Sequence, residues 1–344
     1  MSFSSASRAG KPPEWDVIVS DHLLQVEELK TYFHTFEGIA KAVDDVSFSL
    51  DKSDVLGIVG ESGCGKSVTA QSVLRLVPQP PGRIEHGRIL FDGIDLLAIP
   101  MERMRNIRGN RISMIFQEPM TSLNPVYTIG DQISEMFIKH EKASKKESLQ
   151  KAIEMLRKVQ IPAPERRINE YPHQLSGGMR QRAMIAMALA CNPEILIADE
   201  PTTALDVTIQ AQILDLIMKL REDFETAVMI ITHDLGVIAE AAEKIIVMYA
   251  GNIVEQGSTV DIFDNPMHPY TKGLLESVPV LGVRAKTGRA RLKEIPGIVP
   301  SLYDLASGCS FAPRCPSIKS GCMDALPPLI EHDTGHFVRC LLYA

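Results

Sequence analysis

A glycine-rich loop is the first part of this sequence whose residues could do chemistry. Residues 60–67 read GESGCGKS, which matches the phosphate-loop spacing G-x-x-x-x-G-K-[ST]. The loop follows the apolar run VLGIVG at 55–60 and opens a helical pattern, and a strand before it and a helix after it are the context that this motif requires. Glycines let main-chain N–H groups turn inward around phosphate oxygens, and a helix N-terminus favours an anion. The loop therefore predicts phosphate binding, with a chance glycine turn as the disfavoured alternative.

The side chains of this loop predict a triphosphate bound with magnesium. Lys66 would reach the β- and γ-phosphates, and the Ser67 hydroxyl would ligate Mg²⁺. The residues expected to contact the nucleotide here are Gly60, Ser62, Gly63, Cys64, Gly65, Lys66, Ser67 and Val68.

Two adjacent carboxylates, Asp199 and Glu200, follow the apolar run ILIA at 195–198. An Asp at a strand end is the expected second half of such a phosphate site, because it holds the metal. Glu200 could polarise the attacking water as a general base. Without the phosphate loop, a plain acidic pair that caps a helix would be the better interpretation.

A second candidate anion site lies at 175–182, which reads LSGGMRQR. Ser176, Gly177 and Gly178 precede an apolar helical pattern, so their main-chain N–H groups would meet an anion at a helix N-terminus. The alternative is an ordinary serine N-cap followed by a flexible glycine pair. The position between the phosphate loop and Asp199 weakens that alternative.

The elements that must position these residues alternate between strands and helices. Apolar runs predict strands at 55–60, 88–92, 111–116, 195–198, 227–232 and 245–249. Helical spacing appears at 65–77, at about 131–167 and at 207–220. This alternation predicts an α/β fold with a mainly parallel sheet. The charges of 131–167 are interpreted as a solvated helix surface rather than a binding patch.

Composition narrows the class of protein. The 344 residues are 45% hydrophobic and 23% charged, the ordinary mix for a globular protein. The net charge of −7 argues against non-specific nucleic-acid binding, which needs a basic surface. We expect residues 1–21 to form a flexible arm, since they lack the apolar stretch of a secretory signal. No apolar run reaches the length of a membrane span.

Together these motifs resemble the ATP-binding cassette (ABC) ATPases. LSGGMRQR is similar to the signature motif, ILIADE at 195–200 to the Walker B motif, and residues 204–206 to the D-loop. Gln117 matches the Q-loop and His233 the switch histidine. The resemblance implies a P-loop cassette over about residues 22–257, with a mainly parallel core sheet, an antiparallel β subdomain and a helical subdomain at about 120–190. A small Pro- and Cys-rich extension would follow at 258–344.

The resemblance also implies how the site works. Two cassettes would pair head to tail, with ATP held between the phosphate loop of one chain and the signature of the other. The residues that this implies for catalysis are Lys66, Glu200 and His233; for Mg²⁺, Ser67, Gln117 and Asp199; and for ATP, Gln117, Ser176, Gly177, Gly178, Gln181 and Asp206 as well as the loop. Adenine would stack on Phe33, with Tyr32 as the second choice and core packing as the alternative role.

A finer resemblance links the chain to the ATPase subunits of dipeptide/oligopeptide importers. It rests on FQEPMTSLNP at 116–125, ADEPTTALDVTIQAQ at 198–212, HPYTKGLL at 268–275 and PGIVP at 296–300. It implies ATP-driven uptake of peptides across the cytoplasmic membrane, with this chain bound peripherally on the cytoplasmic side. The implied partners are a second, paralogous ATPase, two membrane permeases and an extracytoplasmic peptide-binding protein, with no nucleic acid.

Alternatives to peptide import are a solute such as nickel, a non-transport ABC ATPase and a non-catalytic regulatory module. One departure from the family's loop is Cys64, where Ser is usual. We expect its side chain to point away from the phosphates and, as a thiol at a helix N-terminus, to be prone to oxidation.

Four cysteines crowd the Pro-rich tail: Cys309, Cys315, Cys322 and Cys340. Cytosolic disulfides are disfavoured, and the gaps of five, six and seventeen residues lack the close pairs of zinc knuckles. A 4Fe–4S cluster also takes four thiolates, and the resemblance to importer tails, some of which carry one, points the same way. Zinc and unmetallated thiols remain the alternatives.

Overall fold

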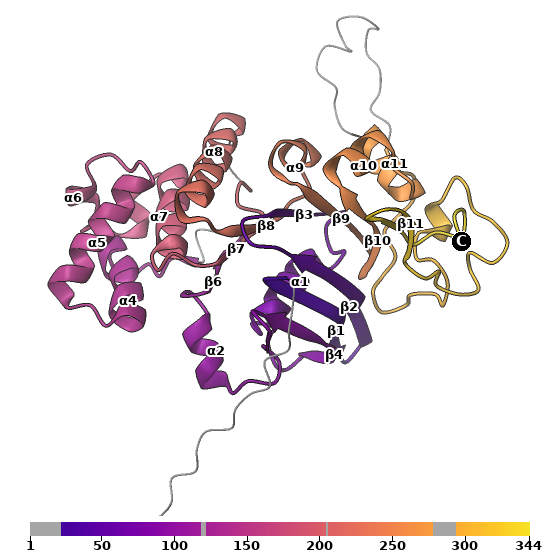
Figure 1. Ribbon diagram of the computed structural model, residues 1–344, viewed down its shortest axis with the longest axis horizontal. Coiled ribbons are helices and arrows are strands. Elements are labelled where there is room, and N and C mark those ends of the chain that lie inside the picture. Colours follow the sequence, from indigo (N-terminus) through magenta and orange to yellow (C-terminus); the bar gives the residue numbers. More distant parts are fainter. Residues whose placement is uncertain (1–21, 118–121, 204–205, 278–293) are drawn as a thin grey trace, which may run out of the picture.

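The computed structural model describes residues 22–117, 122–203, 206–277 and 294–344 (Figure 1). The predicted arm at 1–21 lies outside these residues, as do Ala204 and Leu205 of the predicted D-loop. No helix in the described part of the chain is long and apolar enough to cross a lipid bilayer.

The centre of the molecule is an eight-stranded sheet with the order β11-β12-β10-β9-β3-β8-β7-β6. Five adjacent strands run parallel: β9 (Lys244–Tyr249), β3 (Val55–Val59), β8 (Ala227–Ile231), β7 (Ile195–Asp199) and β6 (Ile112–Ile115). Strands β3, β7 and β8 are buried along their whole length. Such strands read as continuous apolar runs because both faces are covered, which is why the sequence predicted them well.

A second sheet is antiparallel, with the order β2-β1-β4-β5. Its strands are β1 (Leu24–Thr35), β2 (Gly38–Leu50), β4 (Gly82–Phe91) and β5 (Ile94–Asp95). Helix α1 (Lys66–Val73) packs between the two sheets, and its Ala70 and Val73 share one buried core with residues of both. The antiparallel subdomain and the parallel core match the predicted α/β fold.

Helix α1 ends four residues before the predicted stop at Val77. Arg75 has a φ of +52°, and a left-handed residue just past a helix end terminates it. The apolar spacing of Leu76 and Val77 belongs to the turn that follows, so periodicity alone overestimated this helix.

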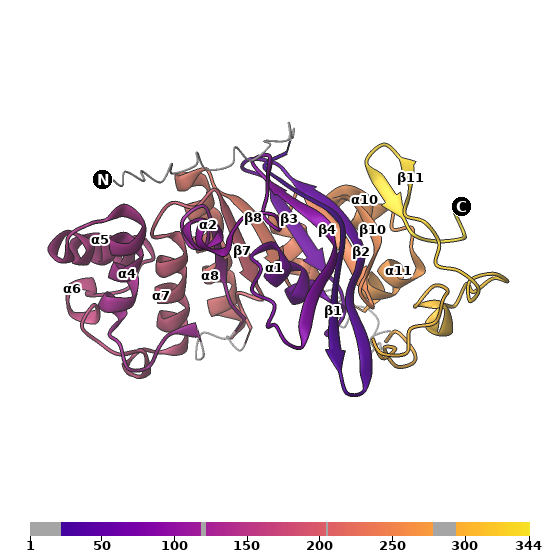
Figure 2. The same cartoon turned by 90° about the horizontal axis from the view of Figure 1, so that it is seen from below.

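Some helices cover the core sheet, and others form a helical subdomain at one end of the molecule (Figures 1 and 2). This region contains α4 (Ile129–Glu141), α5 (Lys145–Lys158), α6 (Pro164–Arg167), the 3-10 turn Pro172–Gln174 and α7 (Gly177–Leu189). The remaining helices are α2 (Met101–Ile107), α8 (Val207–Phe224), α9 (Leu235–Ala241), α10 (Thr259–Asp264) and α11 (Pro269–Glu276). Side chains cap several of them: Thr128, Ser144 and Ser176 accept main-chain N–H groups at the starts of α4, α5 and α7.

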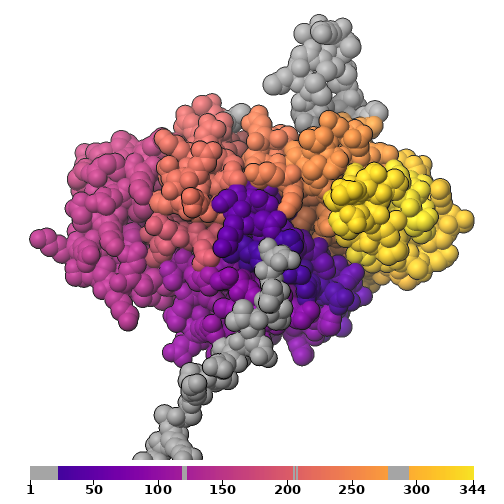
Figure 3. Space-filling model, viewed as in Figure 1, coloured from indigo at the N-terminus to yellow at the C-terminus, as the bar shows by residue number. Residues whose placement is uncertain are grey.

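The C-terminal residues lie at the other end of the molecule (Figure 3). Their hairpin, β11 (Ile330–Asp333) and β12 (His336–Val338), joins the core sheet because β12 pairs with β10 (Asn252–Ser258). A short 3-10 turn, Ala312–Arg314, lies in the loops between. The hairpin at 330–338 therefore extends the central sheet.

Candidate functional site

The phosphate loop joins the end of β3 to the start of α1. Gly60 and Gly65 have φ values of +151° and +105°, which side chains rarely adopt. A Cβ on Gly60 would lie 2.2 Å from the Met248 carbonyl oxygen, and one on Gly65 would lie 2.1 Å from that of Ala42. These two glycines are therefore required by both conformation and space.

Lys66 is held inside this loop. Its ammonium donates to the carbonyl oxygens of Gly60 (2.7 Å) and Glu61 (3.0 Å), and the residue is buried. The Lys66 ammonium is therefore a fixed positive charge within the loop. A phosphate would bind next to it, on the main-chain N–H groups at the start of α1.

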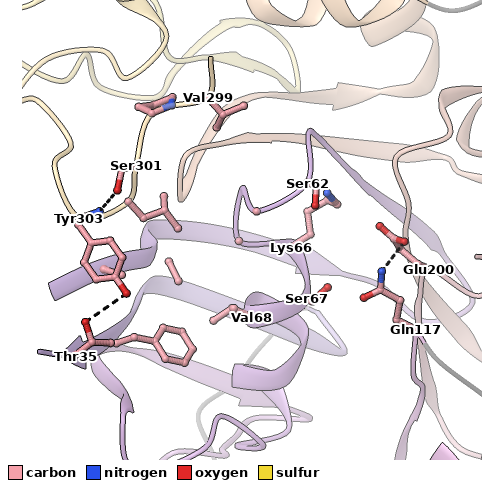
Figure 4. A pocket seen from close by; sticks show the side chains of 17 residues that line it. Thr35, Ser62, Lys66, Ser67, Val68, Gln117, Glu200, Val299, Ser301 and Tyr303 are labelled. Atoms are coloured by element: carbon pink, nitrogen blue, oxygen red, sulfur yellow. Dashed lines mark hydrogen bonds between the residues drawn. The ribbon is translucent and has the colours of Figure 1, made fainter. Parts of the chain in front are cut away.

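A cavity of about 640 Å³ opens above the loop (Figure 4). That is the size of an ordinary small-molecule site. The predicted residues that line it are Phe33, Ser62, Gly63, Gly65, Lys66, Ser67, Val68, Gln117 and Glu200. The structure thus gathers residues from the antiparallel sheet, the phosphate loop and the ends of β6 and β7 around one space.

Two of the side chains expected to hold magnesium, Ser67 and Asp199, are in contact at one end of this cavity, which Gln117 also lines. The Ser67 hydroxyl donates to an Asp199 carboxylate oxygen at 2.8 Å. Burial raises the pKa of Asp199, and the neighbouring Glu200 carboxylate adds to that rise. A hydroxyl, a carboxylate and the amide oxygen of Gln117 are hard ligands of the kind that Mg²⁺ prefers, so this donor set fits the ion.

Glu200 is placed by three polar neighbours. It accepts hydrogen bonds from Gln117 Nε2 (2.9 Å) and Thr203 Oγ1 (2.7 Å), and His233 Nδ1 lies 3.3 Å from it. Burial alone would raise the pKa of Glu200, but the bonds from Thr203 and His233 lower it below its ordinary value. The carboxylate is therefore ionised and oriented at neutral pH.

Backbone geometry explains how Glu200 and His233 meet. Glu200 has a φ of +46° and its N–H donates to the Ile231 carbonyl, which ties the end of β7 to the end of β8. His233 follows β8 and is largely exposed. Ligand sites of parallel sheets lie at the carboxyl ends of the strands, and this site obeys that rule.

Other predicted nucleotide contacts do not line this cavity. Ser176 caps α7, Gly177 and Gly178 begin that helix, and Asp206 caps α8. Gln181 is buried and donates to the Pro201 carbonyl at 2.6 Å; its contact with a nucleotide stays a prediction. Within one chain, the signature residues thus stand apart from the phosphate loop.

The two aromatic candidates for the base have different surroundings. Phe33 lines the cavity, whereas the Tyr32 hydroxyl donates to Asp44 at 2.7 Å. Successive side chains of a strand point to opposite faces, so only one of the two could face the cavity.

Sequence reasoning missed several residues at the site. Thr203 orients Glu200, and residues 299–303 of the C-terminal segment form part of the cavity wall. A signal for residues 299–303 was present, because PGIVP at 296–300 carried part of the family resemblance. The composition of that segment gave no indication that it contacts a nucleotide.

The expectation that Cys64 is prone to oxidation is wrong. Its side chain is buried beneath the loop, and burial raises the pKa of the thiol despite the nearby Lys66 ammonium. Reactivity needs an accessible thiolate. Cys64 instead packs as a small apolar residue, and it does not line the cavity.

The predicted iron–sulfur site has no support from ligand geometry. Among the described residues, no group of three or more His, Cys, Asp or Glu side chains is arranged to hold a metal ion. Cys309, Cys315, Cys322 and Cys340 nevertheless line one small cavity of about 10 Å³, room for about one water molecule. A cubane cluster does not fit this space unless the surrounding loops move.

Comparisons with known proteins agree with the site. Residues 43–203 match the ABC transporter family, and residues 254–322 match the oligopeptide/dipeptide transporter C-terminal region. A probable peptide ABC transporter ATP-binding protein of Sinorhizobium fredii is 56% identical over 93% of this chain and 95% of its own. A dipeptide transport ATP-binding protein of Bacillus subtilis is 50% identical over 94% and 95%.

A solved structure is similar as well. An ATP-binding cassette solved as a dimer with ADP and phosphate has a TM-score of 0.62 and 29% identity, over 69% of this chain and 98% of that one. The shared fold, the matched C-terminal region and the long alignments to curated relatives agree with one another. The chain therefore belongs to the ATP-binding proteins of the ABC transporter family, in its oligopeptide/dipeptide group.

Proposed function

We infer that this chain is the ATP-hydrolysing subunit of an ABC importer for dipeptides or oligopeptides. The observation that carries the inference is the convergence of Lys66, Ser67, Gln117 and Glu200 on one cavity at the ends of parallel strands. Asp199 lies behind Ser67 and accepts its hydroxyl hydrogen bond. The peptide class rests on relatives named as peptide transport proteins and on the matched C-terminal region.

The residues divide the work of phosphoryl transfer. The loop N–H groups and Lys66 would cradle the phosphates and balance charge that develops on them. Ser67, Asp199 and Gln117 would hold Mg²⁺, which neutralises phosphate charge when bound. Glu200, already ionised and oriented by Thr203, would accept the proton of the attacking water. His233, whose Nδ1 lies 3.3 Å from Glu200, would contact the γ-phosphate.

The arrangement also supports pairing with a second cassette. Ser176, Gly177 and Gly178 lie at the start of α7, outside the cavity formed by the phosphate loop of the same chain. A second, paralogous cassette placed head to tail would bring such a helix start to this cavity. In the same arrangement, Asp206 of this chain, which caps α8, would lie near the contact with the second cassette.

Membrane partners complete the proposal. Two permeases would hold the pair at the cytoplasmic face, and a binding protein would deliver the peptide. A permease would dock on residues 117–125, of which 118–121 lie outside the described residues. The adjoining Val126 and Tyr127 are 72% and 55% exposed, which suits a protein contact. Crosslinking at this segment should capture a permease, and protection only at a distant surface would refute it.

The catalytic proposal is tested by Glu200→Gln in the assembled transporter. The variant should bind MgATP yet hydrolyse it at least about a hundredfold more slowly, because the shape is kept and the base is lost. Glu222→Gln, an exposed substitution on α8, is the matched control and should hydrolyse normally. Wild-type turnover in the Glu200 variant would refute the assignment.

A metal at the four-cysteine cavity is a separate proposal. It rests only on the four cysteines that line one small cavity, and that cavity would have to widen to hold a cluster. Burial raises the pKa of Cys309, Cys315 and Cys340, so metal binding would also have to displace their protons. Anaerobically purified protein should be brown with about four irons per chain, and Cys315→Ser should bleach it. Colourless protein that holds zinc, or no metal, would end the iron–sulfur proposal.

A further inference from the structure

The C-terminal segment reaches the nucleotide cavity. Val299, Ser301, Leu302 and Tyr303 line the same space as Lys66 and Glu200. Figure 4 shows Val299, Ser301 and Tyr303 at the end of the cavity away from Gln117 and Glu200. These residues lie more than two hundred positions after the phosphate loop, so only the fold brings them there.

The segment is attached to the antiparallel sheet on one side. The Lys41 N–H donates to the Leu302 carbonyl at 3.2 Å, and the Thr35 hydroxyl lies 3.4 Å from the Tyr303 hydroxyl. Thr35 and Phe33 are two positions apart on β1 and both line the cavity, as the two-residue period of a strand requires. Tyr303 therefore sits beside the strand face that carries Phe33.

Arg314 fixes the other side of the segment. Its guanidinium donates to the carbonyls of Pro296 (3.0 Å) and Ile295 (3.2 Å) and forms two bonds with the Glu61 carboxylate (2.6 and 3.1 Å). Glu61 belongs to the phosphate loop. One buried arginine thus holds the start of residues 295–303 against that loop, and the β1–β2 hairpin holds the end.

The chemistry of the two cavity ends differs. Lys66 and Glu200, the charged residues of the lining, both lie at the phosphate end. The other end offers apolar or aromatic residues, with the hydroxyls of Thr35 and Ser301 as its neutral polar groups: Phe33, Ala40, Ala42, Val299, Pro300, Leu302 and Tyr303. The aromatic and aliphatic faces suit a flat heterocycle, and no cationic side chain in this part of the lining would balance the charge of a phosphate.

We propose that residues 299–303 form the nucleoside wall of the ATP site and that Tyr303 is a nucleotide-binding residue which acts together with Phe33. This rests on the proposed ATPase function and adds the C-terminal extension to the site. Because Arg314 ties the same segment to the phosphate loop, the base end and the phosphate end of the cavity are held by one anchored piece of chain.

Binding of two probes to the full-length chain separates the base end from the phosphate end. Tyr303→Ala should weaken MgATP about 2- to 10-fold, the range for losing one aromatic contact, and should leave magnesium tripolyphosphate binding unchanged. Tyr303→Phe keeps the ring and should bind both like the wild type. Ile298→Ala is the matched control, because Ile298 lies on the same segment, is 90% exposed and does not line the cavity.

Calorimetric titration gives both dissociation constants. Unchanged MgATP affinity in Tyr303→Ala would overturn the inference, and so would an equal loss of ATP and tripolyphosphate, since that would place the effect at the phosphates. Failure of the wild-type chain to bind either probe would instead overturn the proposed ATPase function. An effect of Ile298→Ala as large as that of Tyr303→Ala would also refute the specific role of the tyrosine.

Discussion

Arg314 is the point at which the C-terminal segment holds the phosphate loop, and its removal gives a quantitative prediction. The side chain is 5% exposed and the Glu61 side chain 25%. Besides its two bonds to Glu61, Arg314 donates to the Tyr249 hydroxyl at 3.2 Å. The Glu61 N–H in turn donates to the Tyr270 hydroxyl at 2.8 Å. Arg314 and Tyr270, which both follow the nucleotide-binding motifs in the sequence, therefore hold this one residue of the phosphate loop.

A double-mutant cycle of Arg314→Met and Glu61→Gln measures this link. Breaking a buried ion pair by removing one partner costs about 3–5 kcal/mol, but Glu61 is partly exposed and can regain water. We therefore expect Arg314→Met to lower the free energy of unfolding by about 3 kcal/mol. Hydrogen bonds to charged groups contribute about 1.5–3 kcal/mol, so the coupling energy between the two residues should fall in that range.

Urea unfolding followed by circular dichroism provides the free energies. Arg314→Lys keeps the charge but loses the paired geometry, so its stability should lie between wild type and Arg314→Met. The matched control is the exposed pair of Arg157 and Glu165, whose side chains are 56% and 63% exposed. Surface pairs contribute about 0–1 kcal/mol.

The MgATP dissociation constant is the second readout of the same cycle. Because Arg314 bonds both Glu61 and the chain that leads to residues 299–303, Arg314→Met should weaken MgATP as well as lower stability. A coupling energy between Arg314 and Glu61 no larger than that of the surface pair would refute the reasoning, whatever the stability of the single variants.

Four further outcomes follow from the site. Gly65→Ala should abolish MgATP binding, because the new Cβ would lie 2.1 Å from a carbonyl oxygen. Gly63→Ala would meet no atom within 4 Å, so only backbone strain should weaken its MgATP binding. Calorimetric titration of both variants compares the two affinities. Lys66→Ala should reduce ATP hydrolysis about 10²- to 10³-fold in a phosphate-release assay. Ser67→Ala should raise the Mg²⁺ concentration for half-maximal hydrolysis on the order of tenfold, by analogy with loss of metal-site contacts. Ser176→Arg should block ATP-dependent pairing, seen by gel filtration, while leaving MgATP binding to the free chain intact.

The sequence alone determined the local parts of this protein. The phosphate loop between β3 and α1 could be predicted because its glycines, Lys66 and Ser67 act within a few residues of one another. The buried strands were visible as apolar runs, and Asp199 and Glu200 were visible at the end of one. Family resemblance supplied Gln117 and His233, whose isolated side chains carry no local signal.

Tertiary structure decided what these parts do together. The end of α1 was overestimated because Arg75 takes a left-handed conformation that periodicity does not encode. Cys64 was expected to be reactive, but burial beneath the loop raises the pKa of its thiol. Packing also gave Gln181 a partner that no local pattern indicated, the Pro201 carbonyl.

The largest difference concerns contacts between distant segments. Thr35 and Tyr303 are 268 positions apart in the sequence, yet their hydroxyls lie within 3.4 Å of each other. Glu61 and Arg314 are 253 positions apart and form an ion pair. No local pattern encodes such pairs, because they depend on where the sheet and the loops place each segment. Residues and spacing determined that a nucleotide binds at the phosphate loop; the packing of the C-terminal segment against β1, β2 and that loop decided which residues wall the rest of the site.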